Sequence, residues 1–124
     1  DGALAAGNFF APTLITNASR DMLFTDDETF GPVAFVQAFD TEEEVIEKAN
    51  DTQYGLAAYI LTRDLDRALR VCEAIRAGTV ALNDDVPSNT IAPFGGFKMS
   101  GLGRECSTEG IEAFLETKHV SIGI

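Results

Sequence analysis

The sequence predicts an α/β fold built on a parallel sheet. Strand-like and helix-like stretches alternate along the chain, and the order strand, helix, strand, helix, strand requires right-handed crossovers between parallel strands. Composition supports this prediction. The 124 residues are 45% hydrophobic and 23% charged, which is enough to build a core and unlike a disordered segment.

The expected strands are rich in β-branched and aromatic residues. Residues 9–16 form the first, and Pro12 within it favours an edge or irregular strand, because proline donates no hydrogen bond to a ladder. Residues 33–39 form an almost continuous apolar run, which is typical of a strand covered on both faces. Further strands are expected at residues 57–61, 79–82 and 120–124.

Capping signals mark two helices between these strands. Thr41 and Glu44 form a capping box, and the helix that they start should end near Asn50, because a turn follows. Asp64 can cap the next helix, and Gly78 fits the left-handed position that would end it. The apolar stripe of this second helix consists of Leu65, Ala68, Leu69, Cys72 and Ile75.

A long loop follows the third buried strand, from residue 83 to about residue 106. It leaves the carboxyl end of a parallel strand, where the functional loops of such sheets gather. Loops of this length inside a compact domain are usually functional. Ser107 or Thr108 can cap the helix after the loop. Its expected inner face consists of Ile111, Phe114 and Leu115.

Residues 28–32 combine an acceptor carboxylate, an aromatic ring and a rigid turn. The carboxylate of Glu28 could hold two sugar hydroxyls, and the ring of Phe30 could pack beside a planar heterocycle. Spacing alone favours a simpler interpretation, in which Glu28 is solvated and Phe30 belongs to the core.

The run PFGGFKMSGLGRE at residues 93–105 carries four glycines, which permit close backbone approach and unusual dihedral angles. It lacks the Gly-Lys-Ser/Thr ending of a phosphate loop, and no strand leads directly into it. Its Gly101-x-Gly103 unit is too short to count as a dinucleotide-binding fingerprint.

Taken together, these two segments resemble the C-terminal signatures of the aldehyde dehydrogenase superfamily. Agreement over the thirteen positions of residues 93–105 is specific, and the similarity covers nearly the whole chain. The resemblance implies a three-layer, parallel-sheet C-terminal half of the catalytic domain at residues 1–118 and an oligomerisation strand at residues 119–124. Other matching segments are Asn50-Asp51-Thr52, Tyr54-Gly55-Leu56-Ala57, Asp64-Leu65, Ala77-Gly78-Thr79-Val80 and Asn83.

The resemblance also implies roles for individual side chains. Glu28 matches the glutamate that binds the hydroxyls of the nicotinamide ribose, and Phe30 matches the aromatic beside the nicotinamide. Phe94 matches an aromatic that lines the aldehyde tunnel. Glu105 matches a carboxylate of a proton-release relay. The other relay members and the nucleophile are expected upstream of this chain, as is most of the site for NAD or NADP. We therefore expect the chain alone to be inactive.

Within the superfamily, the loop at residues 86–94 is most similar to succinate-semialdehyde dehydrogenases. In that family a serine that matches Ser88 helps to bind the substrate carboxylate, beside two arginines that would lie upstream. The resemblance therefore implies oxidation of succinate semialdehyde to succinate through a cysteine thiohemiacetal. The sequence departs from the pattern of this family at two places. These are Cys106, where glycine is more usual, and the acidic pair Asp84-Asp85. The alternatives are another semialdehyde or aliphatic aldehyde dehydrogenase, and a non-catalytic interaction module on the same scaffold.

Other chemically capable residues fit structural roles better. Cys106 has no paired base in the sequence, and Cys72 lies on an apolar helix stripe, so neither is expected to be a nucleophile. His119, the single histidine, is expected to be structural or exposed. Arg104 matches a position near the subunit contact. No metal site is expected, since the acidic pair Asp84-Asp85 has no further ligands nearby.

Charge and composition limit the partners and the location. A formal net charge of −11 would repel a phosphate backbone, so nucleic acid is not an expected partner. No apolar run approaches the roughly 20 residues that span a membrane, and no signal peptide is expected. A cytoplasmic setting fits the cysteines, and a start at Asp1 hints at a trimmed or truncated chain. The expected partners are a small aldehyde and, by resemblance, further copies in a homo-oligomer.

Overall fold

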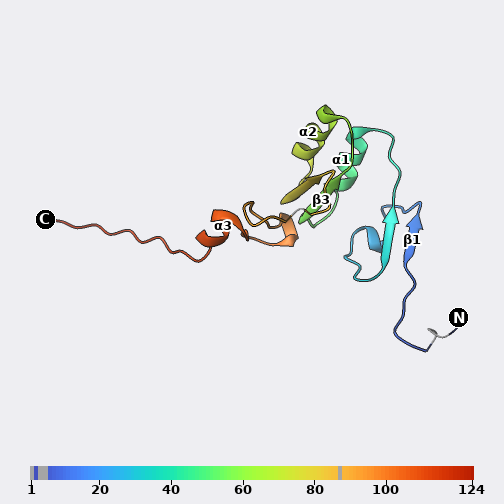
Figure 1. Ribbon diagram of the computed structural model, residues 1–124, viewed down its shortest axis with the longest axis horizontal. Coiled ribbons are helices and arrows are strands. Elements are labelled where there is room, and N and C mark those ends of the chain that lie inside the picture. The colour runs from blue at the N-terminus through green and yellow to red at the C-terminus, as the bar shows by residue number, and fades with distance from the viewer. Residues whose placement is uncertain (1, 3–5, 87) are drawn as a thin grey trace. The chain divides into compact units, whose positions relative to one another are not determined.

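The computed structural model describes residues 2, 6–86 and 88–124, so Pro87 of the loop discussed above lies outside the described residues. The chain divides into two compact units, residues 1–44 and residues 45–124. Each unit contains a pair of parallel strands, and helices accompany them (Figure 1). The predicted α/β class is confirmed.

The first unit is built on the parallel strands β1 (Thr13–Thr16) and β2 (Val33–Val36), which pair in register along their whole length (Figure 1). Strand β1 begins immediately after Pro12, which has no N–H to donate. The N–H of Thr13 instead starts the ladder by donating to the carbonyl of Pro32 at 2.8 Å. The prediction of an irregular or edge strand is confirmed, but the regular part is shorter than predicted.

The segment between β1 and β2 contains a 3-10 turn, Leu23–Thr25. The ring of Phe24 in this turn packs against Phe35 of β2, with ring centroids 5.4 Å apart. The apolar sequence of strand β2 predicted that both of its faces would be covered. This prediction is wrong within the described residues. Phe35 is 42% exposed and Val36 is 50% exposed, because no helix packs against this strand within the described part of the unit.

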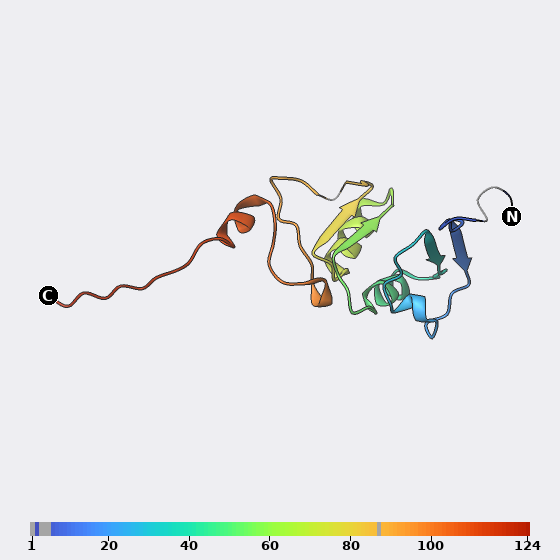
Figure 2. The ribbon, with the colours of Figure 1, turned by 90° about the horizontal axis from the view of Figure 1, so that it is seen from below.

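The second unit is built on strands β3 (Ala57–Ile60) and β4 (Thr79–Leu82), with helix α2 (Leu65–Ala74) as their crossover (Figures 1 and 2). Helix α2 packs against both strands. The hydrophobic residues that are buried within the described part of the chain lie at this contact. They are Ala68 and Val71 of α2 and Ala81 of β4.

The predicted starts of the first two helices are confirmed. Helix α1 (Glu42–Asn50) follows Thr41, whose hydroxyl accepts a hydrogen bond from the N–H of Glu44 at 3.1 Å. The carboxylate of Glu44 accepts in return from the N–H of Asp40 at 2.8 Å, so the capping box closes one residue earlier than the standard form. Asp64 caps α2 by accepting from the N–H of Arg67 at 3.0 Å.

Two predictions about α2 are wrong in detail. The stripe is rotated, because Leu65 and Leu69 are 66% and 54% exposed while Val71 is buried. The helix ends at Ala74, and Gly78 does not adopt the left-handed conformation expected of it. A side chain at Gly78 would collide with the carbonyl oxygen of Gly95, so this position requires glycine for close packing rather than for its dihedral angles.

Helix α3 (Ser107–Glu112) also differs from its prediction. Cys106, rather than Ser107 or Thr108, occupies the N-cap position, and it provides no side-chain cap. The expected inner face is exposed, with Phe114 90% accessible. Residues 115–124 form no helix or strand here, so the predicted tail strand, which needs a neighbour to pair with, stays a prediction. Within the described residues no helix is long and apolar enough to cross a membrane.

Candidate functional site

The glycine loop, residues 94–105, is closed by a backbone bridge between its first and last residues. The N–H of Phe94 donates to the carbonyl of Glu105 at 2.9 Å, and the N–H of Glu105 donates to the carbonyl of Phe94 at 2.7 Å. Two residues for which the sequence predicted roles in the same reaction are therefore direct neighbours. The structure fixes their separation without fixing their roles, which stay predictions.

Glycines allow this loop to pack tightly against its own chain. A side chain at Gly95 would meet the carbonyl of Gly103, and one at Gly96 would meet Ser100. Gly101 and Gly103 have open space around them but adopt φ values of 113° and 83°, which side-chain-bearing residues rarely tolerate. The glycines thus serve the loop's own conformation.

The middle of the loop is anchored to the turn after α1. The ammonium of Lys98 donates to the carbonyls of Asn50 and Thr52, both at 2.9 Å. The hydroxyl of Ser100 accepts from the N–H of Gly55 at 2.9 Å. These residues all belong to segments that match the family pattern, but the sequence predicted no contact between them, because the partners lie more than forty positions apart.

Arg104 holds the two arms of the loop together. Its guanidinium donates to the carbonyl of Gly96 at 3.1 Å and to that of Gly103 at 2.7 Å, and it lies 5.3 Å from the ring centroid of Phe97. A surface hollow beside the loop is lined by Phe94, Arg104 and Glu105, together with Leu56, Gly95, Gly96, Ser100, Leu102, Gly103 and Ala113. The candidate relay carboxylate therefore borders a concave surface that also carries an aromatic ring.

Ser88 lies on an exposed segment that is tied down on both sides. Upstream, the side chain of Asn83 bridges both backbone groups of Thr62, at 3.0 and 2.8 Å. Downstream, the carbonyl of Thr90 accepts from the N–H of Ser107 at 3.0 Å. The structure places Ser88 and the Phe94–Glu105 bridge in the same unit and on the same connection.

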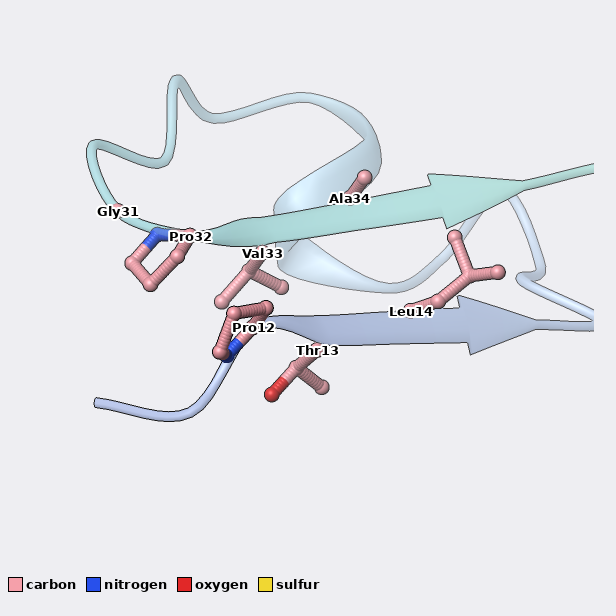
Figure 3. Close-up of a pocket in the computed structure, with 7 residues that line it drawn as sticks. All are labelled: Pro12, Thr13, Leu14, Gly31, Pro32, Val33 and Ala34. Atoms are coloured by element: carbon pink, nitrogen blue, oxygen red, sulfur yellow. The ribbon is translucent and has the colours of Figure 1, made fainter.

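Glu28 and Phe30 lie in the other unit, in the segment just before β2. Both are exposed, and the ring of Phe30 is 91% accessible, so the expectation from spacing that it belongs to the core is wrong within this chain. Figure 3 shows a hollow at the start of the two strands of this unit. Its lining is apolar except for Thr13 and consists of Pro12, Thr13, Leu14, Gly31, Pro32, Val33 and Ala34.

The cysteines and carboxylates suggest no additional centre. Cys72 and Cys106 are both partly buried free thiols. Cys106 has a φ of 59°, which explains why a glycine suits its position in the family pattern. The pKa of Glu109 in α3 lies below its ordinary value because its own N–H and Ser107 donate hydrogen bonds to it. Among the described residues, no group of three or more His, Cys, Asp or Glu could hold a metal ion.

Parallel strand pairs and a self-packed glycine loop after β4 define this chain as an α/β protein with a closed loop at the candidate site. The aldehyde dehydrogenase family profile matches residues 1–120. The chain therefore belongs to the aldehyde dehydrogenase family.

Individual relatives agree with this assignment. The chain is 53% identical to succinate semialdehyde dehydrogenase of Acinetobacter baylyi over 93% of its own length, and 47% identical to glutarate-semialdehyde dehydrogenase of Pseudomonas putida over 99%. A betaine aldehyde dehydrogenase from Staphylococcus aureus, solved in complex with NAD+, matches with a TM-score of 0.87 and 46% identity over 92% of the chain. The chain spans only 24%, 26% and 23% of these proteins, respectively, or about a quarter of their length.

Proposed function

We propose that this chain acts as part of an NAD(P)-dependent aldehyde dehydrogenase that oxidises succinate semialdehyde to succinate. In this reaction a cysteine thiolate outside the chain attacks the aldehyde carbon, the resulting thiohemiacetal loses a hydride, and water hydrolyses the thioester. The direct backbone pairing of Phe94 with Glu105 carries the proposal, because it brings together the two residues that would serve as tunnel wall and proton relay.

The second unit would contribute the substrate side of the site. Phe94 would form one wall of the aldehyde tunnel. Ser88, whose side chain lies on an exposed segment, would donate a hydrogen bond to the substrate carboxylate. Glu105 would accept a proton released during hydrolysis and pass it on, together with relay groups outside the chain. Asp84 and Asp85 lie near Ser88 in sequence, so binding of an anionic substrate would need cationic groups from elsewhere in the protein.

The first unit would contribute to the cofactor site, and its residues fit the nicotinamide end of NAD(P) only. The exposed carboxylate of Glu28 can accept hydrogen bonds from ribose hydroxyls, and the exposed ring of Phe30 can pack beside a flat heterocycle. The apolar hollow of this unit offers no charged group for a pyrophosphate. NAD(P), when bound, supplies the hydride acceptor, and most of its site would lie outside this chain.

A different semialdehyde is the main alternative substrate. Relatives at similar identity are named for succinate semialdehyde, glutarate semialdehyde and betaine aldehyde, so overall identity does not choose among them. A non-catalytic interaction module remains the alternative from another functional class. We further propose a homo-oligomer in the cytoplasm. The alternating exposed residues Val120, Ile122 and Ile124 support pairing of the tail with a neighbouring subunit.

The decisive experiment compares substrates in the full-length protein that contains this chain. Ser88→Ala should raise KM for succinate semialdehyde roughly tenfold or more, because one hydrogen bond to a charged group is lost, and it should change KM for an uncharged aldehyde little. Ser19→Ala, at an exposed serine for which no site role is proposed, serves as the matched control. Equal effects of Ser88→Ala on both substrates would contradict the substrate assignment, and no NAD(P)-linked oxidation of any aldehyde would favour the non-catalytic alternative.

A further inference from the structure

We propose that Lys98 is a positioning residue that holds the glycine loop in the conformation in which Phe94 and Glu105 act. The inference rests on the proposed function of those two residues. The hydrogen bonds that anchor Lys98 are independent of that function. Lys98 is itself partly buried, and its ammonium donates to the carbonyls of Asn50 and Thr52 rather than to Phe94 or Glu105.

The binding site of the Lys98 ammonium lies at the C-terminal end of α1. Asn50 is the last residue of that helix, and its carbonyl is one of those left without an intrahelical partner. This end of a helix also carries partial negative charge, which favours a cation. The carbonyl of Asn50 also accepts from the N–H of Thr52 at 2.9 Å, so the ammonium adds a second bond there. Its two donated hydrogen bonds of 2.9 Å hold the ammonium at one place.

The backbone of Lys98 supports an active role for its side chain. Its φ is 53°, in the left-handed region where glycine is favoured, and this loop uses glycine at two other positions with positive φ. A lysine at such a position is disfavoured unless its side chain compensates. The ammonium contacts supply that compensation, so the side chain and the backbone conformation of the loop depend on each other.

Hydrogen bonds of the residues beside Lys98 connect its anchoring to the Phe94–Glu105 bridge. The N–H of Met99 donates to the carbonyl of Gln53 at 2.9 Å, and the N–H of Phe97 donates to that of Gly55 at 2.8 Å. The loop is therefore fixed at its middle on the turn after α1 and closed at its ends by the Phe94–Glu105 bridge. Release of the middle would loosen the closed end, because the segments between consist largely of glycine-rich backbone.

The test uses three variants of the full-length protein that contains this chain. Lys98→Met removes the donors but keeps an apolar stem, Lys98→Arg keeps donors and charge, and Lys118→Met removes a cation from the exposed tail as a matched control. The first measurement is amide hydrogen exchange at Phe94 and Glu105, whose N–H groups form the bridge. Exchange should be at least roughly tenfold faster in Lys98→Met and near wild type in the other two.

A second measurement separates positioning from general stability. Lys98→Met should lower kcat roughly tenfold or more, and combining it with Glu105→Gln should cost no more than the slower single variant, because both act on one step. Multiplied losses in the double variant, or unchanged bridge exchange in Lys98→Met, would overturn the proposal. If Glu105→Gln alone left kcat unchanged, the relay role would be wrong, and the exchange rates would still decide the role of Lys98.

Discussion

The two units of this chain hold their candidate site residues in opposite ways. In the second unit, side chains bind backbone carbonyls at distant positions in the sequence. Asn50 binds Ala74, Asn83 binds Thr62, and Lys98 of the glycine loop binds Asn50. In the first unit, Glu28 and Phe30 lie exposed on the segment before β2, and the strand pair is held mainly by its ladder and by the contact of Phe24 with Phe35. The glycine loop is thus shaped within one unit, whereas Glu28 and Phe30, the residues proposed to contact the cofactor, would need further surroundings.

The largest expected effect is a complete lack of activity in the isolated chain of 124 residues. If the contrast between the two units holds, the exposed residues Glu28 and Phe30, proposed to contact the cofactor, cannot bind NAD(P) productively alone. Among the described residues, neither Cys72 nor Cys106 is hydrogen-bonded to a base that could activate it as a nucleophile. We therefore expect no NAD(P)-linked aldehyde oxidation by the purified chain. Measurable turnover would show that its chemistry is self-contained.

The isolated chain should also associate with itself. Phe9, Phe30, Leu102 and Phe114 are among many large apolar side chains that are more than 60% exposed. Each of its two-stranded sheets also has unpaired edges. Light scattering should report species larger than the monomer, growing with concentration, whereas a stable monomer at high concentration would contradict the inferred exposure of apolar surface.

The next largest effect concerns the first unit in the full-length protein. Glu28→Gln keeps the size of the side chain but removes the charge that would hold the ribose hydroxyls, so hydride transfer should slow by up to roughly a hundredfold through misplacement of the nicotinamide. The measurement is single-turnover NAD(P)H formation, with Glu43→Gln, on the exposed start of α1, as control. Transfer at the wild-type rate would rule out the ribose role.

Local patterns in the sequence predicted local structure well. The capping residues Thr41 and Asp64 correctly predicted where their helices begin, because an N-cap hydrogen bond spans only three residues. Strand β4 was predicted at its full length, since β-branched and apolar residues there end at the left-handed Asn83. The α/β class followed from the order of these elements.

Long-range contacts could not be predicted in the same way. Gly78 was interpreted as the end of a helix. Glycine is required there because a side chain would collide with the carbonyl of Gly95, which lies far along the chain and gives no local signal. The hydrogen bonds of Lys98 were not predicted for the same reason, since their acceptors lie far along the chain. Ser107 was wrongly predicted as a helix cap because Cys106, one residue earlier, occupies the N-cap position. Residues 93–105 identified the family by resemblance, whereas only coordinates showed that Phe94 and Glu105 are paired.

The smallest expected effect tests how tightly the second unit is packed. A methyl group at Gly78 would collide with the backbone carbonyl of Gly95, which cannot rotate away as a flexible side chain could, so the glycine loop must shift from the start of β4. Gly78→Ala in the full-length protein should therefore lower the free energy of unfolding by roughly 1–3 kcal/mol, the usual cost of overpacking. Gly7→Ala is the matched control, because its added methyl would first meet the exposed ring of Phe9, which can rotate away, and its φ is not in the left-handed region. Thermal unfolding should show a lower midpoint for Gly78→Ala alone. If both variants unfolded at the wild-type midpoint, the loop would be loosely seated, and the contrast between a tightly anchored second unit and an open first unit would lose its basis.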